Sequence, residues 1–270
     1  MTGLTVVLCL LFVVLGHWQW GRAGQKTALW AEFERGAAQV VPLGARTTTD
    51  LPRYSRVRVE GRWEPQRQFL LDNRTHDGRA GYEVLTPLWL DDGRVVLVNR
   101  GWVPFAGYRE RLPDVTAEFA DLPATDAMPG ASADDSIAAG AGAANAVRDA
   151  GRVAVSGRLD ELPSAGLAVG RAPPRLEGAW PRVTAFPRPA ELAGALGVGT
   201  GAGSGTGPRL ERRQLLLDAQ QPRGYVRDWK PGGLGPERNW SYAIQWWSFA
   251  VVLLGLYVGL NLRRTREESR

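Results

Sequence analysis

The sequence has a single cysteine, Cys9, and only two histidines, His17 and His76, among its 270 residues. One thiol can form neither an internal disulfide nor a Cys-x-x-Cys redox or zinc motif, and Cys9 lies in an apolar run. Two histidines so far apart in the chain are too few for a histidine metal cluster. These shortages exclude thiol redox chemistry and the common zinc sites.

Catalytic motifs are equally scarce. His76 lies in the polar stretch Asp72–Asp77, where a solvated side chain is favoured over a general base. The sequence has no Gly-x-Ser-x-Gly elbow, and the glycine tract 197–207 lacks the Lys-Ser/Thr of a phosphate loop. Arginines account for most of the net charge of +5 but are spread along the chain, so nucleic-acid binding is not expected. We therefore expect a protein that is not an enzyme.

Two long uncharged runs stand at the ends of the chain, over residues 2–20 and 240–262. A helix of about 20 residues crosses the hydrocarbon core of a bilayer, so both runs are predicted to be transmembrane helices. A cleaved signal peptide is the alternative for the first run, because its apolar core Leu4–Leu15 is short. No Lys or Arg precedes that core and no small-x-small cleavage site follows closely, which favours a retained helix.

The charges beside the second run predict the orientation. Arg263, Arg264 and Arg266 follow it, as the positive-inside rule expects of a cytoplasmic flank. With two spans, both termini are then cytoplasmic, and residues 263–270 form a short cytoplasmic tail. Residues 21–238 lie on the opposite side of the membrane. No Arg-rich amphipathic leader precedes the first span, which favours a bacterial inner membrane with a periplasmic domain over a mitochondrial one.

The segment between the two runs carries strand patterns. Arg56–Trp63 alternates apolar and polar residues, and Gly81–Leu90 and Arg94–Val98 read as a hairpin whose turn uses Gly93. Residues 121–150 and 197–208 are rich in Gly, Ala and Ser and are predicted to be flexible insertions.

Two sequence phrases recur in the same order. Arg56–Arg62 is echoed by Arg152–Arg158, and Arg67–Asp72 by Arg213–Asp218. The repetition predicts a mostly β domain, barrel- or sandwich-like, built from two similar strand units. The glycines inside the first pair, Gly61 and Gly157, are expected at bulges or bends.

Polar side chains at the outer ends of both apolar runs are costly in a membrane unless they find partners. Asn239, Tyr242 and Trp246 share one helix face by spacing, and Trp18, Arg22 and Lys26 form a stripe if the first helix continues. Two interpretations stay open: hydrogen bonds between the two helices, or an aromatic-lined pocket for a flat apolar ligand such as a porphyrin or quinone. The stripe likewise fits either headgroup anchoring in membrane lipid or a partner contact.

Several motifs together resemble the Surf1 (surfeit locus 1) family of cytochrome oxidase assembly factors. They are Leu15–Lys26, Leu71–Arg74 with Gly81–Tyr82 and Leu85–Leu88, Val96–Pro104 with its Asn-Arg-Gly-Trp-Val-Pro, and Tyr242–Ala250. The resemblance implies a non-catalytic inner-membrane protein that assists delivery or insertion of haem a into the oxidase core subunit. Its implied partners are that subunit and the haem a biosynthesis machinery. The alternative is a membrane-anchored periplasmic binding or sensory module.

One position departs from the family. Family members commonly carry a histidine, proposed as a haem a ligand, where this chain has Asn239, and asparagine is a poor iron ligand. His17 is the substitute candidate. With haem a bound transiently at the outer ends of the helices, the expected contact residues are His17, Trp18, Arg22, Asn239, Tyr242 and Trp246. The expected docking or structural residues are Arg74, Asn99, Arg100, Gly101 and Trp102.

Overall fold

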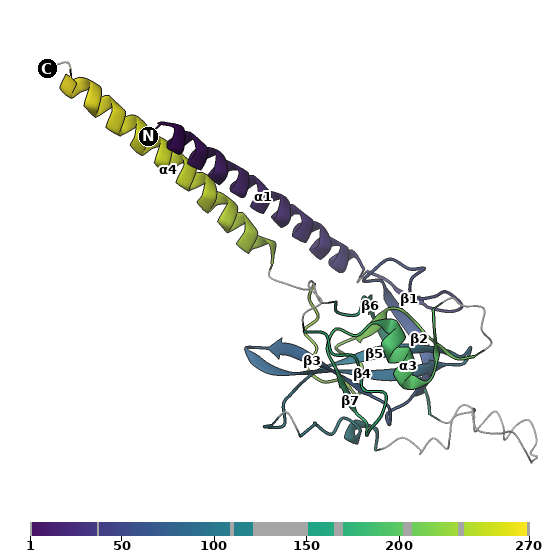
Figure 1. Ribbon diagram of the computed structural model, residues 1–270. Helices are drawn as coiled ribbons and strands as arrows, with labels where there is room; N and C mark the ends of the chain where they lie inside the picture. The colour runs from purple at the N-terminus through teal and green to yellow at the C-terminus, as the bar shows by residue number, and fades with distance from the viewer. Residues whose placement is uncertain are drawn as a thin grey trace, which may run out of the picture. The chain divides into compact units, whose positions relative to one another are not determined.

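The structure is a computed structural model that describes residues 2–36, 38–108, 111–120, 151–164, 170–201, 207–231 and 235–268 (Figure 1). It comprises two units. The helix pair takes in Met1–Arg35 and Lys230–Arg270, and the barrel unit takes in Gly36–Trp229. Two long apolar terminal helices thus flank a mostly β domain, which confirms the predicted fold class. The predicted insertion 121–150 lies outside the described residues.

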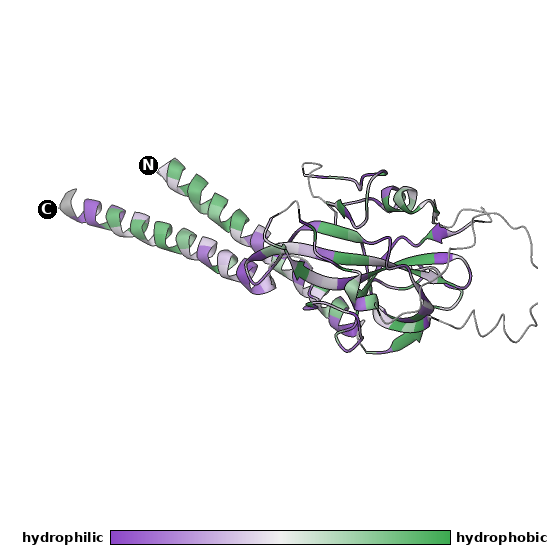
Figure 2. Cartoon of the chain, turned by 90° about the horizontal axis from the view of Figure 1, so that it is seen from below, coloured by the Kyte–Doolittle hydropathy of each residue, from purple (hydrophilic) through white to green (hydrophobic). Residues whose placement is uncertain are grey.

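The helix pair consists of α1 (Thr2–Arg35) and α4 (Pro236–Glu268), which run side by side in opposite directions (Figure 1). Thr2 and Tyr257 hydrogen-bond through their hydroxyls near the chain ends, at 2.8 Å, and Lys26 meets Asn239 towards the other end. Both helices are long and apolar enough to cross a membrane, and hydrophobic residues dominate α1 near the N-terminus and the middle of α4 (Figure 2). Each extends past its uncharged run, because residues such as Ala23, Lys26 and Ala28 favour helix.

The contact between the helices follows a spacing of three and four residues along α1. Gly16 is buried, and a Cβ at this position would lie 2.3 Å from the Trp247 indole nitrogen. Phe12 stacks on Trp246, with ring centroids 5.7 Å apart, and Trp20 lies 5.7 Å from Trp247. Gly16 thus leaves room for the Trp247 indole, and rings fill the contact on both sides of it. Small residues at helix contacts are typical of helices that pack in a membrane.

The single cysteine offers a direct test of this pairing. Cys9 Sγ lies 3.8 Å from the carbonyl oxygen of Ala250, a residue only 8% exposed. We expect Ala250→Cys to form an internal disulfide with Cys9 on mild oxidation, seen as a mobility shift on non-reducing gels. The control Val251→Cys, at a site 71% exposed on α4, should give no internal crosslink. Equal crosslinking of the two variants would contradict the pairing.

The barrel unit is built on a closed ring of five strands. In order around the ring these are β2 (Arg56–Trp63), β6 (Arg152–Asp160), β10 (Gln214–Leu217), β5 (Arg94–Pro104) and β4 (Arg79–Leu90), which pairs back to β2. Only the β10–β5 pair is parallel within this ring. The predicted β4–β5 hairpin is confirmed, with Gly93 at φ 80° in its turn.

Alternate residues of the ring strands fill the barrel interior, as the two-residue period of a strand requires. Trp63 and Phe119, the latter in a short 3-10 helix (Ala117–Phe119), meet edge to face at 5.6 Å. The interior cluster contains Val57, Val59, Trp63, Leu88, Val96, Val98, Phe119, Val155, Leu159, Leu215 and Leu217, together with Leu43 from the loop before β2.

The first repeated phrase forms the two strands β2 and β6, which pair with each other about Val59 and Val155. Their register runs without a break from Arg56 opposite Arg158 to Arg62 opposite Arg152. The predicted bulges at Gly61 and Gly157 are therefore absent from this pair of strands. A Cβ at these glycines would lie 2.3 Å from the carbonyl oxygen of Trp89 and 2.4 Å from that of Leu216, so glycine is needed for close approach of the next strand.

The remaining strands pair with ring strands or with one another, and one short helix packs beside them. They are β1 (Val40–Pro42) on β2, β3 (Phe69–His76) on β4, β7 (Arg182–Thr184) on β3, β9 (Arg209–Leu210) on β5 and β8 (Gly199–Thr200) on β9, with α3 (Pro189–Leu196). Helix α3 buries Leu192 and Leu196 against Phe69, Leu97 and their neighbours. Part of the predicted glycine-rich insertion 197–208 thus forms β8, while 202–206 lies outside the described residues.

Candidate functional site

The Asn-Arg-Gly-Trp motif lies in β5, whose residues are buried from Arg94 to Val103. Asn99 and Arg100 are both 0% exposed and belong to opposite faces of the strand. Arg100 shares the face of Val96 and Val98 and therefore points into the barrel, while Asn99 points to the outer side. A strand buried on both faces places two polar side chains where each must find its partners within the protein.

Arg100 makes its hydrogen bonds to neutral acceptors. Its Nε donates to the carbonyl oxygen of Arg223 at 2.6 Å, and its Nη1 donates to Gln68 Oε1 and to the Val115 carbonyl oxygen, both at 3.1 Å. The guanidinium also lies 4.4 Å from the centre of the Phe119 ring and 4.7 Å from that of Tyr225. Burial lowers the pKa of Arg100 and raises that of Tyr225, but a guanidinium stays charged in proteins. Arg100 is a buried cation held by carbonyls and rings.

Gly101 and Trp102 hold a second segment against β5. The Trp102 N–H donates to the Val226 carbonyl oxygen at 2.8 Å, and the Tyr225 N–H donates to the Arg100 carbonyl oxygen at 2.7 Å. Gly101 has φ 111°, and a Cβ on it would lie 2.5 Å from the Val226 carbonyl oxygen. The motif is therefore an anchor for residues 223–227.

Arg227 fixes the turn that leads into this segment. Its guanidinium donates to the carbonyl oxygens of Asp218, Ala219, Gln221 and Tyr225, at 2.6 to 3.2 Å. Four carbonyls gathered on one cation hold the turn after β10 in a single shape.

Asn99 continues the polar network on the outer face. Its Nδ2 donates to Glu83 Oε2 at 2.7 Å and to Gln214 Oε1 at 3.2 Å, and its Oδ1 accepts from the Gly101 N–H at 3.1 Å. Arg74 lies 3.7 Å from the other oxygen of Glu83. The motif residues are buried, with Trp102 only 8% exposed. This placement favours the structural alternative over a docking role by direct contact.

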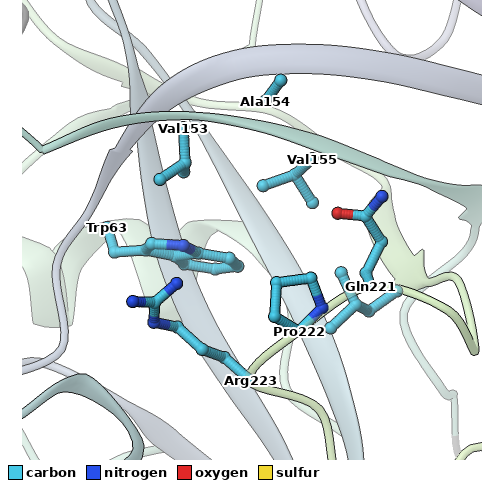
Figure 3. Close-up of a pocket in the computed structure, with 8 residues that line it drawn as sticks. Trp63, Val153, Ala154, Val155, Gln221, Pro222 and Arg223 are labelled. Carbon is cyan, nitrogen blue, oxygen red and sulfur yellow. The ribbon is translucent and has the colours of Figure 1, made fainter. Parts of the chain in front are cut away.

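A cavity of about 270 Å³ opens where the turn after β10 leaves the barrel (Figure 3). Its walls combine apolar side chains with an amide and a guanidinium: Trp63, Val153, Val155, Leu217, Pro222, Gln221 and Arg223, with Ala154 at the edge. Arg223 has φ 60°, a conformation uncommon outside glycine. No sequence pattern pointed to this cavity, because its residues come from three separate segments.

In the helix pair, Asn239 takes part in a polar chain between the helices. Its Nδ2 donates to Gln19 Oε1 at 2.6 Å, and its Oδ1 accepts from Lys26 Nζ at 2.7 Å. Of the two interpretations left open by the sequence, the one with hydrogen bonds between the helices therefore holds for Asn239. Sequence spacing had put Lys26 in the basic stripe but had not paired it with Asn239, since that partner lies 213 residues away.

The other expected contact residues divide between two sides of the helices. Trp246 faces α1, where it stacks on Phe12. His17 and Arg22 are exposed, and Trp18 and Tyr242 are 57% and 41% exposed. Of the expected face, Asn239 and Trp246 therefore contact α1, while Tyr242 is largely exposed.

Comparisons with known proteins agree with the family resemblance that the Asn-Arg-Gly-Trp motif indicates. The SURF1 family profile matches residues 6–251. The chain belongs to the SURF1 family. A SURF1-like protein of Rickettsia bellii is 30% identical over 104 residues, which are 37% of this chain and 43% of the relative. A SURF1-like protein of Dictyostelium discoideum is 44% identical over 55 residues, 20% of each chain. The cytochrome oxidase assembly protein SHY1 of Saccharomyces cerevisiae is 32% identical over 112 residues, 37% of this chain and 29% of the relative.

Each of these alignments spans less than half of the relative. The match to the SURF1 profile, in contrast, takes in most of α1, the barrel unit and half of α4. The family match thus includes residues of both units, among them the β5 motif and the turn at Arg227.

The haem ligand implied by the SURF1 resemblance can be tested against the helix geometry. Both polar atoms of the Asn239 amide are used by Gln19 and Lys26, and an amide is a poor iron ligand. His17 is the only histidine of the helix pair, and it is exposed. The residues between the two helices therefore do not fit axial ligation of a haem.

Proposed function

We propose that this SURF1 family protein is an assembly factor for a haem-copper cytochrome oxidase, and that it acts by docking rather than by catalysis. The family match over residues 6–251 carries the proposal, supported by a relative named as a cytochrome oxidase assembly protein. Among the described residues no group of three or more His, Cys, Asp or Glu could hold a metal ion. Within the buried motif, Arg100 anchors the 223–227 segment and Asn99 bonds to Glu83 and Gln214, which fits a scaffold better than an active site.

In this proposal the helix pair anchors the protein in a bacterial inner membrane. Because the helices are antiparallel, the chain ends share one side, and Arg263, Arg264 and Arg266 favour the cytoplasm for that side. The barrel unit then faces the periplasm. Its partners are the oxidase core subunit and the machinery that makes haem a.

Delivery or insertion of haem a is the finer part of the proposal. Since the residues between the helices do not fit axial ligation, His17 is the residue through which the helix pair would ligate iron. A haem titration of the purified chain beside His17→Ala tests this. Equal spectra for the two proteins would remove His17 from the proposal and leave the docking function in place.

Deletion of the gene tests the function itself. We expect membranes of the deletion strain to lose most of the haem a absorbance and oxidase activity, and the intact gene to restore both. An oxidase with full haem a content and activity in the deletion strain would overturn the proposal. A changed transcriptional response without an oxidase defect would favour a membrane-anchored sensory module instead.

A further inference from the structure

The cavity of about 270 Å³ beside the turn after β10 reaches side chains of the barrel interior. β10 pairs with β6 only as far as the bond from the Asp218 N–H to the Ser156 carbonyl oxygen, at 3.1 Å, and the chain then turns away. Trp63, Val155 and Leu217 belong to the interior cluster, and all three line the cavity. Small barrels are normally filled by their own side chains. Here apolar interior surface borders a space that a ligand can fill.

The wall formed by residues 221–223 is held in place by hydrogen bonds to the backbone (Figure 3). Arg227 Nη1 donates to the Gln221 carbonyl oxygen at 2.9 Å. Arg100 Nε donates to the Arg223 carbonyl oxygen at 2.6 Å. A site that has its bound shape before the ligand arrives avoids part of the entropic cost of binding. The cavity is in this sense preorganised.

Arg223 brings its charge to the cavity from a strained backbone. Its φ is 60°, a conformation that is uncommon outside glycine. Residues held in such conformations cluster at ligand sites, where the position of the side chain matters more than the cost of the strain. The Arg223 guanidinium lies beside Trp63, and the Gln221 amide lines the other end of the cavity (Figure 3). The strain therefore indicates that the guanidinium is used at this place.

The geometry of a guanidinium allows Arg223 to bind a ligand without giving up its contacts in the protein. The centre of its guanidinium lies 5.8 Å from the centre of the Phe119 ring. A guanidinium has five N–H donors in its plane and none on its faces. A contact through the face can thus persist while N–H groups at the edge donate to an acceptor in the cavity.

A second cation lies behind the cavity. Arg100 is 0% exposed, its guanidinium lies 4.4 Å from the centre of the Phe119 ring, and the three acceptors of its hydrogen bonds are neutral. Its buried Nη2 makes no hydrogen bond to a described residue. Burial lowers the pKa of Arg100, and the charge of Arg223 also lowers it; Glu118 acts in the opposite sense. A buried cation without a hydrogen-bonded carboxylate makes the potential positive, which favours an anion nearby.

We propose that the cavity beside the β10 turn binds a small carboxylic acid with an apolar body. The carboxylate would accept hydrogen bonds from Arg223, and the apolar body would lie between Trp63, Val155 and Pro222. The volume of about 270 Å³ is just below the ~300–1,000 Å³ of sites for drug-sized ligands, so a single ring or a short branched chain would fill it. This inference stands on the barrel unit alone and does not depend on the proposed function.

Calorimetric titration of the full chain in detergent micelles with hydrocinnamate tests the inference, with the heat of empty micelles subtracted. Hydrocinnamamide, the neutral amide of the same shape, is the matched control ligand. We expect the wild type to bind the acid about tenfold more tightly than the amide, because hydrogen bonds to a charged acceptor are stronger. Arg223→Met should weaken binding of the acid about tenfold and binding of the amide less than about threefold. Arg58→Met, which removes an exposed charge outside the cavity, should change neither.

Arg223→Gly separates binding from stability. Glycine adopts positive φ without strain, so we expect this variant to unfold at or above the temperature of the wild type while it binds the acid as weakly as Arg223→Met does. If Arg223 only holds the fold, both variants should instead unfold well below the wild type, and that result would overturn the proposal. So would equal affinity of the wild type for the acid and the amide, or an equal loss of both ligands in Arg223→Met. Absence of any heat above empty micelles at millimolar hydrocinnamate would overturn it as well.

Discussion

Gly101→Ala should lower the stability of the barrel unit more than any other single methyl addition in β5. At φ 111° an L-residue is strained, and the new Cβ would lie 2.5 Å from the Val226 carbonyl oxygen and 2.8 Å from Arg227 Cγ. The segment 223–227 must move away, which breaks the pairing of Trp102 with Val226. We expect a loss of about 3–5 kcal/mol, or roughly 10 °C in Tm for a domain of this size.

The matched control is Gly93→Ala. Gly93 also has positive φ, 80°, but no atom lies within 4 Å of the position its Cβ would take. Strain alone then applies, and we expect a loss of about 1 kcal/mol. Chemical unfolding of the full chain in detergent, followed by tryptophan fluorescence, measures both. If the two variants lose the same stability, close approach of Val226 does not matter, and the anchoring role of the motif is wrong.

The fold was predictable where local sequence determines structure. The hairpin at Gly93 and the alternation in Arg56–Trp63 depend on residues close together in the chain, and both are present. The first repeat also predicted two like strands. That β2 and β6 pair with each other could not be predicted, because pairing is decided by which strands meet in three dimensions.

The second repeat shows the same limit more sharply. Arg67–Asp72 and Arg213–Asp218 share a pattern, yet β10 closes the ring between β6 and β5 while β3 lies outside it on β4. A shared sequence pattern therefore indicates that both strands are covered on both faces. It does not indicate where in the sheet each strand lies. Gly61 and Gly157 hold equivalent positions in the two copies of the first repeat, and each lies against the backbone of the strand next to it.

In the candidate site, sequence identified residues but not their partners. Asn239 was singled out because a polar group at a membrane boundary needs a partner, but Gln19 and Lys26 could be named only once the helices were paired. The residues around Arg100 come from positions 68, 115, 119, 223 and 225, which no local pattern connects. The several N–H donors of one buried guanidinium can hydrogen-bond to segments that are distant in the sequence. These bonds can be seen only in the folded chain.

Arg100 is accordingly the second position where a large effect is expected. Arg100→Met keeps much of the apolar stem but removes the donors to the Arg223 and Val115 carbonyl oxygens, leaving buried acceptors unpaired. Arg100→Lys keeps the charge, but a single ammonium cannot reach three acceptors and lie between two rings. We expect both variants to lose about 3–5 kcal/mol of unfolding free energy. The exposed Arg58→Met, the control, should stay within about 0.5 kcal/mol of the wild type.

Hydrogen exchange distinguishes anchoring from a general loss of stability. If Arg100 holds the 223–227 segment, the Tyr225 and Val226 amides, which donate to the carbonyls of Arg100 and Trp102, should exchange faster in both variants under native conditions. The amides of the β2–β6 ladder should change only by the global loss. A lysine variant that matches the wild type would show that the charge alone matters. The guanidinium geometry would then have no part in the anchor.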